Sequence, residues 1–391
     1  PAHGRLTFET TRRAGEYHVT TPVYRFADRA WMEFLELNPV WATLQGIEAW
    51  DDRLDDPSAA GRAALMAVID GWAAQIEALA TSELEVEDAV TLGLMDAVVR
   101  RFQGAHELRL WQLEALDQIN GPHSLVGELA RFHRTDTPER FEKLLTRLAA
   151  YPGWVAAHQA NTAAGVAAGR TAPAPVVERC ITQTQELLEI PAAASPLMEA
   201  SSGLPAAQQA ALLAAIERDV LPPLRSWLET LLDYRGHVRA GDGVCHLADG
   251  EAIYRHAIQS YTNLDEDPQA IHDYGLMRLD EIEAAEASIA HELGHDSVTA
   301  LRVFLDGDPD NHADTPEEMV ARVRTWVERA EREAPKWFGD PPPERCEVRA
   351  VEAHAEKSAP AGFYFAPAED GSRPGIYFLN TYDPSSRPLH Q

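Results

Sequence analysis

Basic residues and cysteines are scarce in this sequence. Lys and Arg together number 34 among 391 residues, against 62 Asp and Glu, and the formal net charge is -28. A surface this negative repels phosphate backbones and anionic lipid headgroups. We therefore expect neither a nucleic-acid partner nor a membrane partner.

Long hydrophobic runs, a signal-peptide core and paired cysteines are also missing. The sequence has no stretch of about 18 consecutive apolar residues, and residues 1–22 read as a polar N-terminal tail. Cys180, Cys245 and Cys346 lie far apart and form no CxxC pair, which excludes a disulfide framework and a cysteine-based zinc site. The expected location is the cytoplasm.

Hydrophobic residues spaced as on one face of a helix recur through most of the chain. Leu65, Ile69 and Trp72 lie three or four positions apart, and Thr315-Pro316-Glu317-Glu318 is typical of a capped helix start. These patterns predict a mostly α fold. The main predicted helices cover residues 58–80, 88–110, 137–149, 151–169, 173–188, 206–232, 249–261, 268–293 and 317–334.

The character of the chain changes at Pro341-Pro342-Pro343. Three later stretches are rich in aromatic and β-branched residues and predict strands, 346–353, 362–366 and 375–382. We expect residues 23–340 to form a large helical scaffold and residues 341–391 a small antiparallel β-sheet segment. Three strands leave at least one unpaired edge, so self-association through exposed strand edges is expected.

The sharpest motif is an H-E-x-x-H sequence, His291-Glu292-Leu293-Gly294-His295. On a helix, His291 and His295 would share a face and could hold zinc, with Glu292 as general base and a downstream Glu as a third ligand. Gly294 instead favours a helix end at this point, with His295 in solvent. Both interpretations are open, and no zinc is expected in this chain.

An acidic stretch from Asp306 to Glu317 places acids at several positions of a calcium loop. Asn311 stands where such loops use glycine, and Pro309 and Pro316 stiffen the stretch. An acidic connector between two helices is the alternative interpretation.

Three isolated histidines, His256, His272 and His354, are interpreted as structural or solvated rather than catalytic. The sequence has no nucleophile elbow, phosphate-binding loop or dinucleotide fingerprint. Acyl hydrolases of the nucleophile-elbow type, nucleotide hydrolases and dinucleotide-dependent enzymes therefore have no support.

Several short stretches, taken in order, resemble one bacterial family, the domain-of-unknown-function family 885. They are Asn38-Pro39-Val40-Trp41-Ala42-Thr43-Leu44-Gln45-Gly46, Asp51-Asp52-Arg53-Leu54, Asp249-Gly250-Glu251-Ala252-Ile253-Tyr254, Ile271-His272-Asp273-Tyr274-Gly275 and Gly375-Ile376-Tyr377-Phe378-Leu379-Asn380-Thr381. Each stretch alone is weak. Their order and spacing make the resemblance fairly specific, and it covers nearly the whole chain.

The resemblance implies a largely helical fold like that of gluzincin-type zinc metallopeptidases. In that family the zinc-binding helix comes shortly after the segment that here reads Asn380-Thr381-Tyr382-Asp383-Pro384, so we expect it beyond Gln391. No family ligand or general base can then be assigned in this chain, and zinc is expected only in the complete family protein. The region around His291 matches a helix end of the family.

The resemblance also implies a role for the last predicted strand. In gluzincin-like folds an edge strand pairs with extended substrate, which makes Tyr377, Asn380 and Thr381 the candidate substrate-binding residues. We expect the chain to be the N-terminal part of a zinc-dependent peptidase or related hydrolase, with a peptide or small-molecule substrate and little activity by itself. The alternative is a non-catalytic helical scaffold or binding module.

Overall fold

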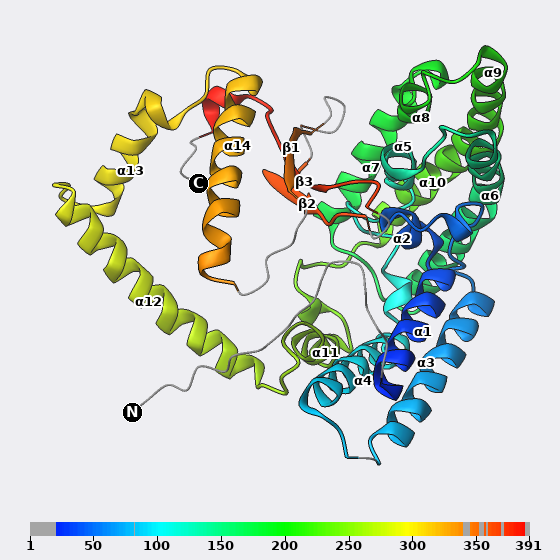
Figure 1. Ribbon diagram of the computed structural model, residues 1–391, viewed down its shortest axis with the longest axis horizontal. Helices are drawn as coiled ribbons and strands as arrows, with labels where there is room; N and C mark the ends of the chain where they lie inside the picture. Colours follow the sequence, from blue (N-terminus) through cyan, green and yellow to red (C-terminus); the bar gives the residue numbers. More distant parts are fainter. Residues whose placement is uncertain are drawn as a thin grey trace. The chain divides into compact units, whose positions relative to one another are not determined.

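The computed structural model describes residues 21–81, 83–338, 345–351, 356, 359–368 and 371–387. The chain divides into two compact units (Figure 1). The first, called here the helical unit, comprises residues 29–301 and 368–372, and the second, the sheet unit, comprises residues 1–28, 302–367 and 373–391. Pro341-Pro342-Pro343, His354 and nearly all of the polar N-terminal tail lie outside the described residues.

Helices make up most of the described chain, so the predicted mostly α fold is confirmed. The helices are α1 (Pro22–Leu37), α2 (Pro39–Leu44), α3 (Ala59–Leu79), α4 (Val86–Glu107), α5 (Leu125–Phe132), α6 (Pro138–Ala167), α7 (Ala174–Glu189), α8 (Pro196–Ala200), α9 (Ala206–Ala215), α10 (Leu221–Tyr234), α11 (Gly250–Thr262), α12 (Pro268–Glu292), α13 (Val298–Gly307) and α14 (Pro316–Glu333). The strands are β1 (Cys346–Ala350), β2 (Gly362–Phe365) and β3 (Gly375–Leu379).

The main core of the helical unit lies among α5, α6, α7, α9 and α10. α10 packs against both α6 and α7, and the side chains of Trp227, Tyr151 and Tyr234 are almost fully buried there. Full burial of a large apolar side chain contributes roughly 2–3 kcal/mol before the cost of ordering it. α6 is the longest helix, with 30 residues, and it carries both core residues and the polar contacts that shape the site below.

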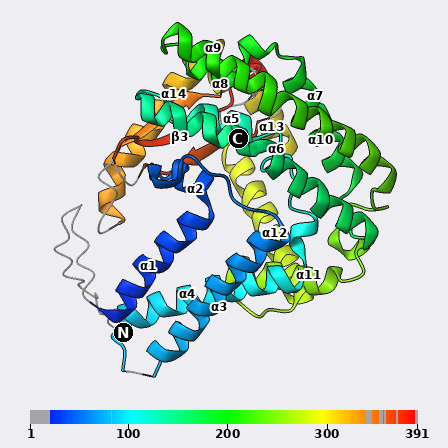
Figure 2. The same ribbon diagram turned by 90° about the vertical axis from the view of Figure 1, so that its right-hand side faces the viewer.

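α3 and α4 form an antiparallel hairpin (Figure 2). α3 begins where it does because the Ser58 hydroxyl accepts a hydrogen bond from the backbone nitrogen of Gly61, at 3.2 Å. Trp72 of α3 is buried, and its indole nitrogen donates to Glu33 at 2.7 Å. α11 packs against α4, the second helix of this hairpin. This group of helices surrounds the candidate site.

The sheet unit contains a three-stranded sheet in the order β1-β3-β2. β3 runs parallel to β1, with Cys346 opposite Gly375, and antiparallel to β2, with Tyr364 opposite Tyr377. The sheet is therefore mixed, and the expected all-antiparallel arrangement is wrong. β2 and β3 pair in opposite directions, whereas β1 occupies the other edge of β3 and runs in the same direction as β3.

α14 packs against β1 of the same unit. Val348 and Leu379 from the strands form an apolar cluster with Met319 and Val323 of the helix. Thr315 caps α14, because its hydroxyl accepts from the nitrogen of Glu318, so the predicted helix start is confirmed. This packing groups α14 with the strands, so the compact units divide the chain at other places than the predicted ranges 23–340 and 341–391.

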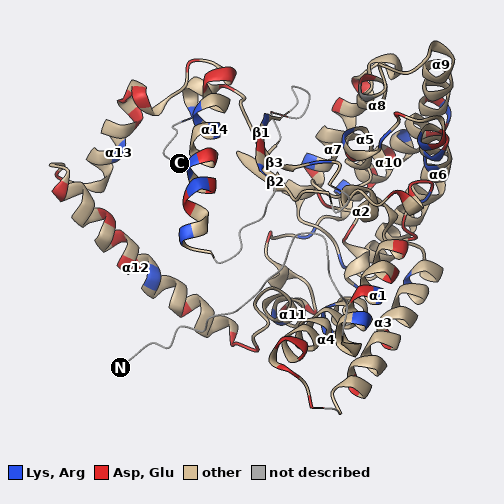
Figure 3. Cartoon of the chain, viewed as in Figure 1, with Lys and Arg blue, Asp and Glu red and all other residues tan. Residues whose placement is uncertain are grey.

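Acidic side chains are spread over both units (Figure 3). On α12 they outnumber the single arginine of that helix, Arg278. Among the described helices, none is long and apolar enough to cross a membrane.

Candidate functional site

The H-E-x-x-H motif does not lie on one continuous helix. α12 ends at Glu292, and Gly294 adopts the left-handed conformation with a φ of 83°. The nitrogen of Gly294 donates to His291 O, and the nitrogen of His295 donates to Ala290 O at 2.8 Å. These two bonds form a Schellman motif, which satisfies the last carbonyls of a helix and turns the chain away. His295 therefore does not stand one turn beyond His291 on a shared face.

No group of three His, Cys, Asp or Glu side chains in the described part of the chain could hold a metal ion. The acidic stretch from Asp306 is instead a connector with internal bonds. The Asp308 side chain caps a short turn, the Asn311 amide donates to Leu305 O, and the Arg322 guanidinium donates to Asp310 O. These hydrogen bonds tie the connector to α13 and to α14, the two helices that it joins.

The three candidate substrate-binding residues lie in and after β3, which is the central strand of the described sheet. The expectation of an edge strand at residues 375–382 is wrong for β3, since β1 and β2 occupy both of its edges. Asn380 is fully buried, and its amide donates to Glu356 O at 2.6 Å and Ala359 O at 2.9 Å. Thr381 is also buried.

Tyr377 packs against neighbours in its own unit. Its ring covers Gly362 on the adjacent strand, where a Cβ atom would lie only 2.4 Å from the Tyr377 hydroxyl oxygen. Tyr364 covers Gly375 in the same way on the other strand. Such aromatic cover over strand glycines stabilises register. A substrate-binding role for Tyr377, Asn380 and Thr381 stays a prediction, and their contacts are those of structural residues.

A second polar region, in the helical unit, is organised by α6. Arg147 of α6 is completely buried, and its guanidinium donates to the backbone oxygens of Arg53 at 2.7 Å, Trp50 at 3.0 Å and Pro39 at 3.4 Å. It thereby holds the segment 38–57, which contains two of the stretches that carry the family resemblance. The hydrogen bonds of Arg147 to these two stretches fix the path of the backbone there.

Side chains complete this buried cluster. Arg147 also donates to the Thr43 hydroxyl at 2.9 Å and lies 3.5 Å from the Asp51 carboxylate, and Thr43 donates to the same carboxylate. His133 donates through Nε2 to Arg140 O, which leaves Nδ1 to accept from Arg147. Burial lowers the pKa of Arg147 to about 10 and also lowers the pKa of His133.

α6 holds the segment at a second point, Asn161. The Asn161 amide nitrogen donates to Pro57 O at 2.8 Å, and its oxygen accepts from Arg62 of α3 at 2.8 Å. Arg62 also donates to Pro57 O, at 2.6 Å. Asp55 and Asp56 lie just before this anchor, so the two attachments to α6 fix the place of both carboxyl groups.

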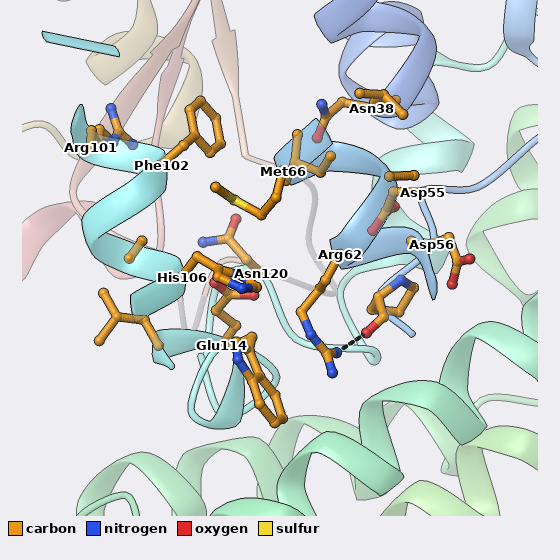
Figure 4. A pocket seen from close by; sticks show the side chains of 18 of the residues that line it. Asn38, Asp55, Asp56, Arg62, Met66, Arg101, Phe102, His106, Glu114 and Asn120 are labelled. Carbon is orange, nitrogen blue, oxygen red and sulfur yellow. Dashed lines mark hydrogen bonds between the residues drawn. The ribbon is translucent and has the colours of Figure 1, made fainter. Parts of the chain in front are cut away.

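These carboxyl groups line a cavity of about 1010 Å³ (Figure 4). Its polar lining comes from the residue before α2, the 55–62 segment, α4, the turn after α4, α6 and α11. The polar side chains are Asn38, Asp55, Asp56, Arg62, Arg101, His106, Glu114, Asn120, His158, His256, Ser260 and Tyr261. Apolar residues, among them Met66, Phe102 and Ile253, line the rest. A cavity of this size, mostly apolar with a few convergent polar groups, is typical of small-molecule sites.

Three carboxyl groups in and beside the cavity, those of Asp55, Glu114 and Glu128, are harder to ionise than usual. Burial raises the pKa of Asp55, against the smaller opposing effects of the Trp154 indole and Arg147. The Trp154 indole makes no ordinary hydrogen bond to the described residues, so its effect on Asp55 is weak. Burial also raises the pKa of Glu128, to about 7, with Arg131 opposing and Asp55 adding to the rise.

Glu114 faces the cavity and is accessible to solvent there, yet protein atoms crowd its carboxyl group. Desolvation raises its pKa, Arg62 lowers it, and Asp55 raises it further. Perturbed carboxyl groups gathered in one cavity are typical of functional sites.

His158 and His256 also line the cavity. The His158 ring packs edge-on against Trp154, and its Nε2 is buried without a partner among the described residues. Burial lowers the pKa of His158 to about 4 and also lowers the pKa of His256. Both rings are thus neutral at pH 7. The sequence predicts a structural or solvated role for both His256 and His272. The structure places His256 at the cavity and His272 on the exposed surface of α12.

The cavity and the helices around it define a helical protein with a ligand-sized pocket. The chain belongs to a bacterial family of unknown function, DUF885, whose model matches residues 39–391. The family resemblance inferred from the sequence is thus confirmed. No curated protein matches the chain.

A solved structure described as "the putative lipoprotein from Colwellia psychrerythraea" is similar to this chain, with a TM-score of 0.81 and 19% sequence identity. The match covers 94% of this chain and 68% of that chain. At this identity the likeness shows the fold.

Proposed function

We propose that the chain is the substrate-binding part of a peptidase-like hydrolase and that the cavity of the helical unit holds the substrate. The observation that carries the proposal is the cavity itself. It combines two arginines, Arg62 and Arg101, with several carboxyl groups and an apolar wall in a volume of about 1010 Å³. A peptide carries the complementary groups, since it has a carboxylate for an arginine, an ammonium group for the carboxylates and apolar side chains for the apolar wall.

The zinc implied by the resemblance to gluzincin-type peptidases does not fit the described residues. They contain no group of three suitable side chains, and a Schellman motif separates His295 from the helix that carries His291 and Glu292. The proposal therefore assigns substrate binding to this chain and no catalytic step to these three residues.

Two neighbouring alanines of α3 provide the test. Ala64 lines the cavity, whereas Ala63 is exposed and does not line it. We expect trialanine to bind the chain in a calorimetric titration, Ala64→Trp to weaken binding at least tenfold, and Ala63→Trp to leave it unchanged. If trialanine fails to bind, or binds equally well to both variants, the proposal is wrong.

A non-catalytic binding module is the second candidate, since the cavity could hold a ligand without any catalytic step. Chromatography of the trialanine mixture, with and without added zinc, separates the two. Cleavage that Ala64→Trp suppresses supports a hydrolase, whereas binding without cleavage supports the module. The cytoplasmic location and self-association through strand edges stay predictions.

A further inference from the structure

Arg62 is held rigidly at the wall of the cavity. One terminal nitrogen, Nη1, donates to Pro57 O at 2.6 Å and to the Asn161 amide oxygen at 2.8 Å. The guanidinium carbon lies 3.9 Å from the ring centroid of Trp111, so the flat face of the group rests on the indole. The side chain is therefore fixed before any ligand arrives.

Arg62 nevertheless forms no ion pair with the described residues, although three carboxyl groups line the same cavity. Its Nε and Nη2 donors also have no hydrogen-bond partner there, and Figure 4 shows the side chain reaching into the space between Glu114 and Asp56. A guanidinium group stays charged at any physiological pH. A charged, fixed group with two unused donors is suited to bind a planar anion through both.

The rest of the lining decides which anion fits. Asp55, Asp56 and Glu114 would repel a ligand that is only negative, such as inorganic phosphate. They would attract a ligand that also carries a cationic group. Met66, Phe102 and Ile253 can cover an apolar side chain. The combination matches a zwitterion with an apolar body.

We propose that Arg62 is the carboxylate anchor of the cavity and that the ligand is a short peptide with a free C-terminal carboxylate and a free amino group. The carboxylate would lie edge-on to Nε and Nη2, and the ammonium group would face the carboxyl groups of Asp55 and Glu114. This inference rests on the proposed function, because it specifies the substrate of that same cavity.

The test compares alanyl-phenylalanine with its C-terminal amide by calorimetric titration of the full chain. The amide keeps the shape and the ammonium group but loses the carboxylate. We expect the free acid to bind at least tenfold more tightly than the amide. Arg62→Gln is expected to abolish this difference by weakening the free acid alone, and Arg62→Lys is expected to restore part of it.

Arg100→Gln is the matched control. Arg100 is exposed on α4, does not line the cavity, and its loss makes the same change in net charge. It should leave the preference for the free acid intact. A thermal melt of each variant shows whether it is folded, and Arg62→Lys provides a second variant if Arg62→Gln does not fold.

Two failures are distinguishable. Equal affinity of the chain for the acid and the amide overturns the carboxylate anchor and leaves the substrate cavity standing. If neither compound binds and trialanine also fails, the proposed function and this inference fall together. If Arg62→Gln still binds the free acid more tightly than the amide, the proposal that Arg62 anchors the carboxylate is also wrong, because another group must then bind the carboxylate.

Discussion

Two arginines attach the segment 38–57 to the rest of the helical unit, and they do so differently. Arg147 is completely buried. Its guanidinium donates hydrogen bonds to three backbone oxygens, a hydroxyl and an imidazole, and it forms an ion pair with a carboxylate. Arg62 donates hydrogen bonds through Nη1 alone, to Pro57 O and the Asn161 amide oxygen, and the flat face of its guanidinium lies on the Trp111 indole. One cluster is saturated and closed, and the other is open to a cavity.

The difference shows how to separate a structural polar cluster from a binding site in this protein. Burial and charge do not separate them, because both regions hold desolvated arginines and acids. Saturation of the hydrogen-bonding groups does separate them. A buried charge must be satisfied by the protein itself, whereas an accessible charge can be completed by a ligand.

The largest expected effect comes from replacing the two arginines by methionine. Arg147→Met leaves the Asp51 carboxylate and three backbone oxygens buried without their donor, so we expect a loss of about 3–5 kcal/mol in the free energy of unfolding. Arg62→Met should cost about 1 kcal/mol, since it removes two exchangeable hydrogen bonds. Urea unfolding followed by circular dichroism measures both, and equal losses would erase the distinction between the clusters.

The carboxyl groups provide a second contrast, smaller in size. Asp51 is paired inside the closed cluster, whereas Glu128 lies beside Asp55 with its pKa raised to about 7. Because this pKa is higher in the folded chain than the ordinary 4.5, the folded state favours the proton. The associated stabilisation is complete below about pH 4.5 and is lost as the pH rises through 7.

Glu128→Gln removes this titration, because its amide stays neutral at every pH. Relative to the unchanged chain, we expect the variant to gain about 2–3 kcal/mol of stability between pH 5 and pH 8. Unfolding at several pH values tests the sign. Glu77→Gln, at an exposed position of α3, is the control and should run parallel to the unchanged chain.

The smallest effect concerns one hydroxyl of the closed cluster. Thr43 donates to Asp51 and accepts from Arg147, so Thr43→Val leaves both partners short of one bond at constant side-chain shape. We expect a loss of about 1–2 kcal/mol. Thr182→Val is a useful comparison, since its exposed hydroxyl bonds only to a carbonyl of its own helix. A loss at Thr43 no larger than at Thr182 would mean that the cluster is not saturated as described.

Much of the fold could be predicted from the sequence because the signals are local. Helical spacing placed α3, and the Thr315 cap placed the start of α14 within one residue. The strands were found at nearly the right positions as well. Their order was not, because pairing depends on contacts distant in sequence, and β3 proved to be central rather than at an edge.

The cavity could not be predicted in the same way. Arg62, Glu114 and Trp111 form no motif, and they meet only because α6 holds the segment 38–57 while α3 and α4 pack as a hairpin. The H-E-x-x-H letters were visible, but Gly294 ends the helix that the motif needs. Several sequence signals lie near the site: the Asp51-Asp52-Arg53-Leu54 stretch comes directly before Asp55, and Asn38, Ile253 and His256 line the cavity. None of them indicates a cavity by itself.

The attachment of a single loop at Arg147 and Asn161 has a consequence for how the protein can vary. The two residues are 14 positions apart on one helix, which is about 21 Å along its axis. The segment 38–57 is held at two separate points of one helix, so its backbone path does not depend on the side chains that face the cavity. Evolution or an engineer could replace the side chains at 55 and 56 to admit a different ligand, while the path of the loop and the helices beneath it remained the same.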